Sequence, residues 1–274
     1  MSASSLRLAP RWKYLSILLM AAQRTLAYRR TVLTNLATSL VWLAASYYLW
    51  RAVFVSQAQI GDFDWVRMRT YILLAYAVNV LLNSSFSTYR VTYLIRSGDV
   101  ANELIRPLDF MRAQLAMSLG SALVEGLFSS IIALVIGLAA FQAQLPASPL
   151  AGVLFPISVL FGFVVKFLIN YLVALLCFWT KNSLGLIWAQ TAVVNILSGA
   201  VIPLEFFPAW LKGLTLVLPF QAIVNAPLSI YLGGVQGLAL LTTLGAQVLW
   251  IGLLFGLARL LWLPSLRALE IQGG

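Results

Sequence analysis

Six long apolar stretches decide what this chain can fold into. They lie at Leu33–Trp50, Tyr71–Ser87, Leu115–Phe141, Leu150–Trp179, Leu184–Ile202 and Leu238–Trp262. Each has at least about 17 residues, the lower limit for a helix that crosses a bilayer. Of the 274 residues, 61% are hydrophobic and 9% are charged, whereas about 25% are charged in an ordinary soluble domain. The sequence therefore predicts an all-α polytopic membrane protein with six transmembrane helices.

The residue types that the sequence lacks exclude most enzymatic functions. No histidine is present, which removes His-based acid–base catalysis, Ser-His-Asp triads and the common zinc sites. Cys177 is the single cysteine, so no intrachain disulfide can form. No lysine follows a glycine, so the phosphate-binding pattern GxxxxGKS or GxxxxGKT cannot occur. We therefore predict no catalytic residue, no metal ligand and no cofactor on this chain.

The net charge of +10, from 18 basic and 8 acidic residues, points to the membrane. In a soluble protein it would suggest nucleic acid, but here we expect no nucleic acid and a lipid bilayer as the partner. Thirteen basic residues lie in the N-terminal segment, the loop after the second span, the loop around Lys181 and the C-terminal segment. Four lie on the other side of the spans: Arg51, Arg67, Arg69 and Lys212. The positive-inside rule therefore places both termini in the cytoplasm.

The first 30 residues allow two interpretations. Basic residues precede the apolar run Tyr14–Ala22, an order that secretory signal peptides share. However, five apolar residues recur at the spacing of a single helix face. They are Leu15, Leu18, Leu19, Ala22 and Leu26. Because a signal peptide does not need a two-faced helix, we predict an amphipathic helix in residues 1–30 that lies on the cytoplasmic leaflet.

Residues 90–112 form the loop between the second and third spans, and they contain several helix boundaries. Gly98 can end the preceding helix, and Asp99 can cap a new one. Pro107 ends this new helix, and Asp109 can cap the third span. The loop therefore predicts a short helix between two turns.

The composition of that short helix, Val100–Ile105, favours a docking role. Val100, Leu104 and Ile105 are apolar, and Glu103 lies in the first turns, where the helix dipole favours an acidic residue. A solvated connector is the alternative. The density of boundary residues favours a rigid docking element.

A second unusual segment, residues 203–237, is too short and too often interrupted by proline to span the membrane. We predict a re-entrant or interfacial helix on the outer face. The residues that mark it are Pro203, Phe207, Pro208, Trp210 and Pro219.

Two charged residues, Glu125 and Lys166, lie inside the predicted third and fourth spans, at equal depth near the middle of the bilayer. The short loop between these spans predicts antiparallel neighbours and therefore an ion pair. Asn170, one helical turn from Lys166, could add a hydrogen bond. The alternative is that these residues form a substrate or proton site.

The cytoplasmic loop and the outer segment also carry recurring motifs. The loop has Ile95-Arg-x-Gly-Asp, followed by Leu104-x-Arg106-Pro-Leu-Asp109. The outer segment has Pro203, then Phe207-Pro-x-Trp-Leu, then Leu218-Pro-Phe. With the six spans and the basic N-terminal helix, these motifs resemble bacterial ABC exporter permeases of the ABC-2 class.

The resemblance implies a type V, ABCG-like permease fold. Residues 1–30 would be the connecting helix, residues 31–264 the transmembrane domain and residues 265–274 a cytoplasmic tail. Two permease subunits, of the same or different chains, would pair, and separate ABC ATPase subunits would bind ATP and Mg²⁺. Residues that would couple the permease to the ATPase are Arg96, Gly98, Asp99, Val100, Glu103, Leu104, Arg106, Pro107 and Asp109.

This resemblance implies export of an amphipathic or lipid-like substrate across the bacterial cytoplasmic membrane, by alternating access at the permease interface. Two other functions fit the sequence less well. An ion-coupled secondary transporter needs an ionisable network and often internal repeats, and the sequence has one candidate charge pair and no repeat. A lipid-modifying membrane enzyme needs a cluster of catalytic groups, which the absence of histidine disfavours.

Overall fold

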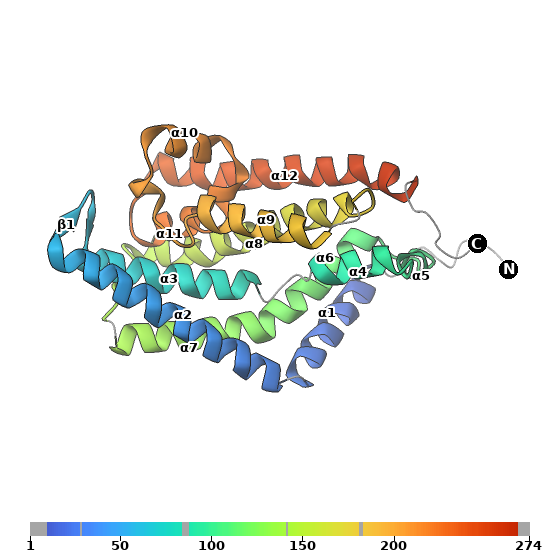
Figure 1. The fold of residues 1–274 in the computed structure, drawn as a ribbon, viewed down its shortest axis with the longest axis horizontal. Helices are drawn as coiled ribbons and strands as arrows, with labels where there is room; N and C mark the ends of the chain where they lie inside the picture. Colours follow the sequence, from blue (N-terminus) through green and yellow to red (C-terminus); the bar gives the residue numbers. More distant parts are fainter. Residues whose placement is uncertain (1–9, 28, 84–87, 141, 181–182, 268–274) are drawn as a thin grey trace.

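The computed structural model shows an elongated bundle of helices with one small β-hairpin (Figure 1). It describes residues 10–27, 29–83, 88–140, 142–180 and 183–267. The hairpin pairs β1 (Gln59–Ile60) with β2 (Phe63–Asp64), and it lies at one end of the bundle, which we call the hairpin end. The short helices α4 (Thr88–Arg96) and α5 (Val100–Leu104) lie at the opposite end, which we call the α5 end.

Several longer helices run along the length of the bundle. They are α2 (Arg29–Ser56), α3 (Trp65–Asn83), α8 (Pro149–Leu176), α9 (Ser183–Leu197) and α12 (Leu238–Arg267), together with α6 (Phe110–Ser121) and α7 (Leu127–Ala140), which the π-helical turn η1 (Ala122–Gly126) joins. The remaining elements are α1 (Pro10–Ala27), η2 (Leu204–Phe206), α10 (Ala209–Val217), η3 (Pro219–Ala222) and α11 (Asn225–Tyr231). Each predicted apolar stretch coincides with a helix over most of its length.

Three described helices are long and apolar enough to cross a membrane: Phe110–Ile132, Pro149–Leu176 and Leu238–Arg267. The apolar helix of the fifth predicted span is shorter. Its predicted continuation to Ile202 is wrong, because Gly199 adopts a φ of +84° and the helix ends before it. The 15 residues of α9 extend about 22 Å, which is less than the hydrocarbon core of about 30 Å.

The buried core lies around α8 and joins it to the helices on both sides. The ring of Tyr171, which is 1% exposed, lies 6.3 Å from Phe110 at the start of α6 and 6.4 Å from Trp262 of α12. At the other end of α8, the Ser148 side chain accepts a hydrogen bond from the Ala151 backbone N–H and caps the helix. These aromatic contacts place the sixth predicted span beside the fourth.

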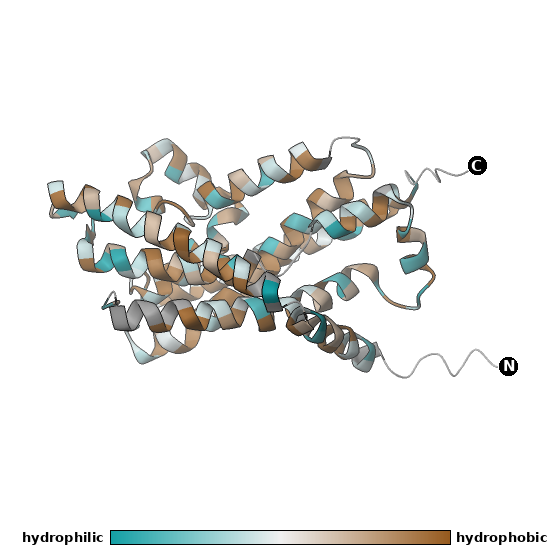
Figure 2. Ribbon diagram, turned by 60° about the horizontal axis from the view of Figure 1, so that its bottom comes forward, coloured by the Kyte–Doolittle hydropathy of each residue, from teal (hydrophilic) through white to brown (hydrophobic). Residues whose placement is uncertain are grey.

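Apolar side chains also cover much of the outside of the bundle. Figure 2 shows hydrophobic residues along the long helices, and Leu241, Leu249 and Leu260 of α12 are more than half exposed. Exposed apolar surface of this extent is unfavourable in water and favourable against lipid tails. The arrangement is that of a multi-pass membrane protein.

Helix α1 packs against α6 through a close backbone approach at Gly120. A Cβ added at Gly120 would overlap the Leu18 carbonyl and lie 2.9 Å from the Ala21 Cβ. By contrast, Leu15, Leu19 and Leu26 are exposed. The predicted single apolar face of the N-terminal helix is therefore divided between a contact with α6 and an exposed stripe. Residues 1–9 of this predicted segment lie outside the described residues.

Candidate functional site

The loop between α4 and α5 has a backbone conformation that favours glycine at position 98. Gly98 adopts a φ of +77°, a left-handed conformation that ends α4. Asp99 stands at the N-cap position of α5, but its own backbone is helical and its side chain makes no capping bond. Instead, the Ser97 hydroxyl donates a hydrogen bond to the Asp99 carboxylate at 2.8 Å. The predicted capping role of Asp99 is therefore wrong, because the carboxylate is turned back into the preceding turn.

Helix α5 presents both a buried anchor and an exposed apolar end. Val100 is fully buried. The helix ends at Leu104, one residue earlier than predicted and before Pro107. Leu104 and Ile105 are exposed, and Ile105 is 82% exposed. The surface therefore offers an apolar tip held on a short helix, which is the arrangement expected of a docking element.

Ion pairs hold α5 in place. Glu103 lies 3.0 Å from Arg106 and 4.0 Å from Arg90 of α4. These contacts tie the C-terminal end of the short helix to α4 and to the residue that follows Ile105. The side chain of Arg96, also predicted to act in coupling, lies outside the described residues.

Asp109 follows this loop and joins three helices. Its side chain accepts a hydrogen bond from the Arg112 backbone N–H at 2.9 Å, so it caps α6 as predicted. Its other carboxylate oxygen lies 2.5 Å from Nη1 of Arg259 in α12. Its backbone N–H donates to the Tyr14 hydroxyl of α1 at 3.0 Å. Through this one residue, the α5 loop is connected to the third span, the sixth span and the N-terminal helix.

These contacts determine the ionisation of Asp109. Partial burial acts to raise the pKa of the carboxyl group, but the hydrogen bonds from Arg259 and Arg112 and their positive charges outweigh it. The pKa of Asp109 is therefore lower than its ordinary value. Sequence reasoning found Asp109 but missed Tyr14 and Arg259, because residues so far away in the chain carry no local signal of their contact.

The two intramembrane charges do not meet. Asn35 of α2 donates a hydrogen bond from Nδ2 to the Glu125 carboxylate at 2.7 Å. Lys166 is 8% exposed and lines a cavity together with Asn170, whose Oδ1 accepts a hydrogen bond from Gln190. None of the ion pairs between described residues joins Glu125 to Lys166.

The predicted ion pair is therefore wrong, and the packing of the helices explains why. The π-helical turn that contains Glu125 and the following α7 pack against α3, whereas α8 packs against α11 and α12. Consecutive spans with a short connection are therefore not neighbours along their length. Such π-helical turns are rare and recur at functional sites.

The segment after α9 folds into short helices whose boundaries follow its prolines. Pro203 precedes η2, Pro208 precedes α10 and Pro219 begins η3. Trp210 of α10 is 73% exposed, while the following α11 is mostly buried and packs against α8. Phe207 ends η2 in an extended conformation. The single predicted helix is therefore two helices, one on the surface and one in the core.

Three cavities follow one another along α3, starting near the hairpin end of the bundle. The hairpin-end cavity, about 400 Å³, contains Arg67 and Tyr71. The middle cavity, about 350 Å³, contains Tyr71 and Asn195. The α5-end cavity, about 290 Å³, contains Asn195 and Lys166. Because neighbouring cavities share Tyr71 or Asn195, they form a row with polar groups at every level.

The long apolar helices define a multi-pass helical membrane protein. A family described as ABC-2 family transporter protein matches residues 40–273. The chain belongs to that family, so it is a membrane component of an ABC transporter and not itself a catalytic subunit. Membership implies partnership with ABC ATPase subunits. A search among curated proteins found no significant match.

Proposed function

We propose that this chain is the permease subunit of an ATP-driven exporter, with α5 as the helix that receives the movement of the ATPase. The observation that carries the proposal is the position of Asp109. It directly follows the α5 loop and contacts α1, α6 and α12 at once. A displacement of α5 is thereby transmitted to helices far apart in the chain.

The exposed tip of α5 supplies the contact with the ATPase. Ile105 and Leu104 would insert into an apolar hollow on the ATPase subunit, since exposed apolar residues at a helix end gain most from burial in a partner. The ion pairs of Glu103 with Arg106 and Arg90 would keep α5 in a fixed position relative to α4 when the ATPase moves it. ATP and Mg²⁺ would bind to the ATPase alone.

The cavities along α3 would provide polar contacts for the substrate. They offer hydroxyl, amide and charged groups between apolar walls, which fits an amphipathic or lipid-like molecule. Movement of α6 and α12 would change the access to this row between its two ends. We place the α5 end in the cytoplasm, on the basis of the unequal distribution of basic residues.

The complete transporter would contain two permease subunits with six spans each, in a type V arrangement, and both termini would face the cytoplasm of a bacterial cell. A secondary transporter would bind its own coupling ion. Such a site needs a network of ionisable groups, and Glu125 and Lys166 lie in different environments and do not form one together.

Affinity purification of the full chain from native membranes tests the proposal. A nucleotide-hydrolysing ABC subunit should copurify, and Ile105→Glu should reduce its yield at least tenfold. Leu145→Glu is the matched control, because Leu145 is also an exposed apolar residue but lies in the loop before α8, away from α5. Loss of the subunit with both variants, or with neither, would contradict docking through α5.

A further inference from the structure

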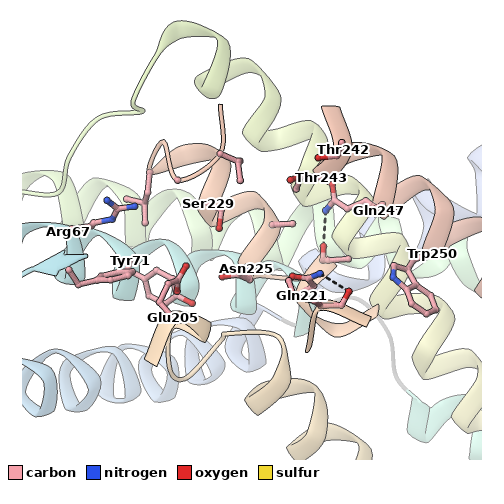
Figure 3. Close-up of a pocket in the computed structure, with 18 residues that line it drawn as sticks. Arg67, Tyr71, Glu205, Gln221, Asn225, Ser229, Thr242, Thr243, Gln247 and Trp250 are labelled. Atoms are coloured by element: carbon pink, nitrogen blue, oxygen red, sulfur yellow. Dashed lines mark hydrogen bonds between the residues drawn. The ribbon is translucent and has the colours of Figure 1, made fainter. Parts of the chain in front are cut away.

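The hairpin-end cavity is charged at one end and neutral at the other. Figure 3 shows Arg67 and Glu205 at the charged end, Gln247 and Trp250 at the neutral end, and Asn225 between them. Arg67 comes from α3, Glu205 from η2 and Asn225 from α11. Three separate parts of the chain therefore build the charged end. The whole cavity has a volume of about 400 Å³.

Gln247 and Thr243 at the neutral end already form hydrogen bonds within the chain. Gln247 donates from Nε2 to the Ser158 and Ala222 carbonyls and accepts a hydrogen bond from the Ser158 hydroxyl. Thr243 donates its hydroxyl to the Ala239 carbonyl. Gln247 thereby holds α12 against α8 and η3, whereas the Thr243 bond lies within α12.

Two polar groups at the charged end are not satisfied. Nε of Arg67 and Oδ1 of Asn225 are buried, and neither has a hydrogen-bond partner among the described residues. The guanidinium lies 5.2 Å from the centre of the Phe63 ring, which positions it without neutralising it. Buried donors and acceptors are unfavourable unless they are paired.

Arg67 and Glu205 also line the same cavity without forming an ion pair. The three ion pairs between described residues, at the 4.0 Å limit, all lie elsewhere. A cation and an anion that face one cavity without contact leave room for a group that contacts both. Such a group must carry a negative part for Arg67 and a positive part for Glu205.

We propose that the charged end of this cavity binds a zwitterionic group of the phosphoethanolamine type. The phosphate would accept hydrogen bonds from the Arg67 guanidinium, a pairing with favourable geometry. The ammonium would donate to the Glu205 carboxylate and to Oδ1 of Asn225. A purely anionic ligand would leave Asn225 unpaired and face Glu205, and an uncharged ligand would neutralise neither charge.

This inference deepens the proposed function, because it names the headgroup class of the exported molecule, and it rests on that function for the claim of transport. The same chemistry occurs in a lipid headgroup and in a soluble molecule. The binding site itself does not depend on the ATPase.

Binding of labelled phosphatidylethanolamine to the full chain in detergent tests the site directly. Phosphatidylglycerol and diacylglycerol serve as the anionic and the uncharged lipid. Soluble glycerophosphoethanolamine shows whether the site binds the group in a soluble molecule as well as in a lipid. We expect Arg67→Gln to weaken the binding of both phospholipids about tenfold. Glu205→Gln should weaken the binding of phosphatidylethanolamine about tenfold, and it should leave the binding of phosphatidylglycerol unchanged or make it tighter.

Matched controls keep the result specific to the cavity. Arg51→Gln and Asp62→Asn remove exposed charges that do not line it, and both should bind phosphatidylethanolamine as the unmodified chain does. Equal binding of phosphatidylethanolamine and diacylglycerol would overturn the proposal. Equal effects of the cavity variants and their controls would also overturn it.

The outcomes separate this inference from the proposed function. If an ATPase copurifies but binding does not depend on the headgroup, the cavity assignment alone fails. If headgroup binding follows the expected pattern but no ATPase copurifies, the site stands and the exporter assignment fails.

Discussion

Arg259 of α12 pairs with Asp109 at the start of α6, with Nη1 2.5 Å from the carboxylate oxygen. The two residues are 150 positions apart in the chain. Asp109 uses its remaining groups to cap α6 and to contact Tyr14, so this pair is part of a junction between three helices. Because this junction directly follows the α5 loop, a displacement of α5 would be expected to move the helices that meet there.

A double-mutant cycle on this pair should reveal its coupling energy. Asp109→Asn and Arg259→Gln each remove one charge, and each should lower the free energy of unfolding by about 1–2 kcal/mol, since the pair is partly exposed and screened by solvent. The double variant should lose less than the sum of the two, by about 1 kcal/mol. Thermal and chemical unfolding of the detergent-solubilised chain measures this. Fully additive losses would show that the two side chains do not interact.

The contribution of Asp109 to stability should depend on pH. Its pKa is lower in the folded chain than in the unfolded one, so ionised Asp109 stabilises the fold at pH values above the unfolded pKa of about 4. This stabilisation should be lost as the pH falls through the folded pKa. The stability difference between the unmodified chain and Asp109→Asn should therefore be constant from about pH 5 to 7 and shrink below about pH 4. A difference that grows on acidification would contradict the ion pair.

Gly98 should tolerate no side chain without strain, although space is available. Its φ of +77° is unfavourable for other residues, and a Cβ there would meet nothing within 4 Å. We expect Gly98→Val to cost about 1–2 kcal/mol and to uncouple ATP hydrolysis from transport in the complex. Gly245→Val is the control, because this position of α12 is equally open and its φ is not left-handed. If both variants lose stability and coupling to the same extent, the left-handed conformation of Gly98 is not required for coupling.

Glu125 and Lys166 should act independently. Glu125 contacts Asn35, and Lys166 lies in a different environment beside Asn170. The effects of Glu125→Gln and Lys166→Met on thermal stability should therefore add within about 0.5 kcal/mol, as for distant sites. If the double variant instead recovers stability, the two charges interact, as the sequence predicted.

Local signals in the sequence predicted the helical elements well. The length of the apolar runs predicted helices at all six stretches, and the glycine and proline positions marked the turns around α5. Asp109 was predicted as a cap because capping depends on residues three positions apart. Asp99 had the same signal but bonds to Ser97 instead, because short polar side chains can choose between competing local partners.

The arrangement of the helices was less predictable. The pairing of Glu125 with Lys166 was inferred from loop length, yet α3 rather than α8 packs beside α7. The cavity residues Arg67, Glu205 and Asn225 come from three distant segments, so only the folded chain brings them together. Arg67 was noticed in the sequence as one of a few basic residues on the outer side, which gave its charge but not its partners.

The most direct test of the central claim is photo-crosslinking from position 105 in intact membranes. A photoreactive phenylalanine analogue at Ile105 should crosslink this chain to an ABC ATPase subunit, and the yield should change when the complex binds ATP. The same analogue at Leu145 should give no ATPase crosslink. If position 105 crosslinks only to lipid or to other parts of this chain, or if both positions capture the ATPase equally, then α5 is not the element that couples ATP hydrolysis to transport.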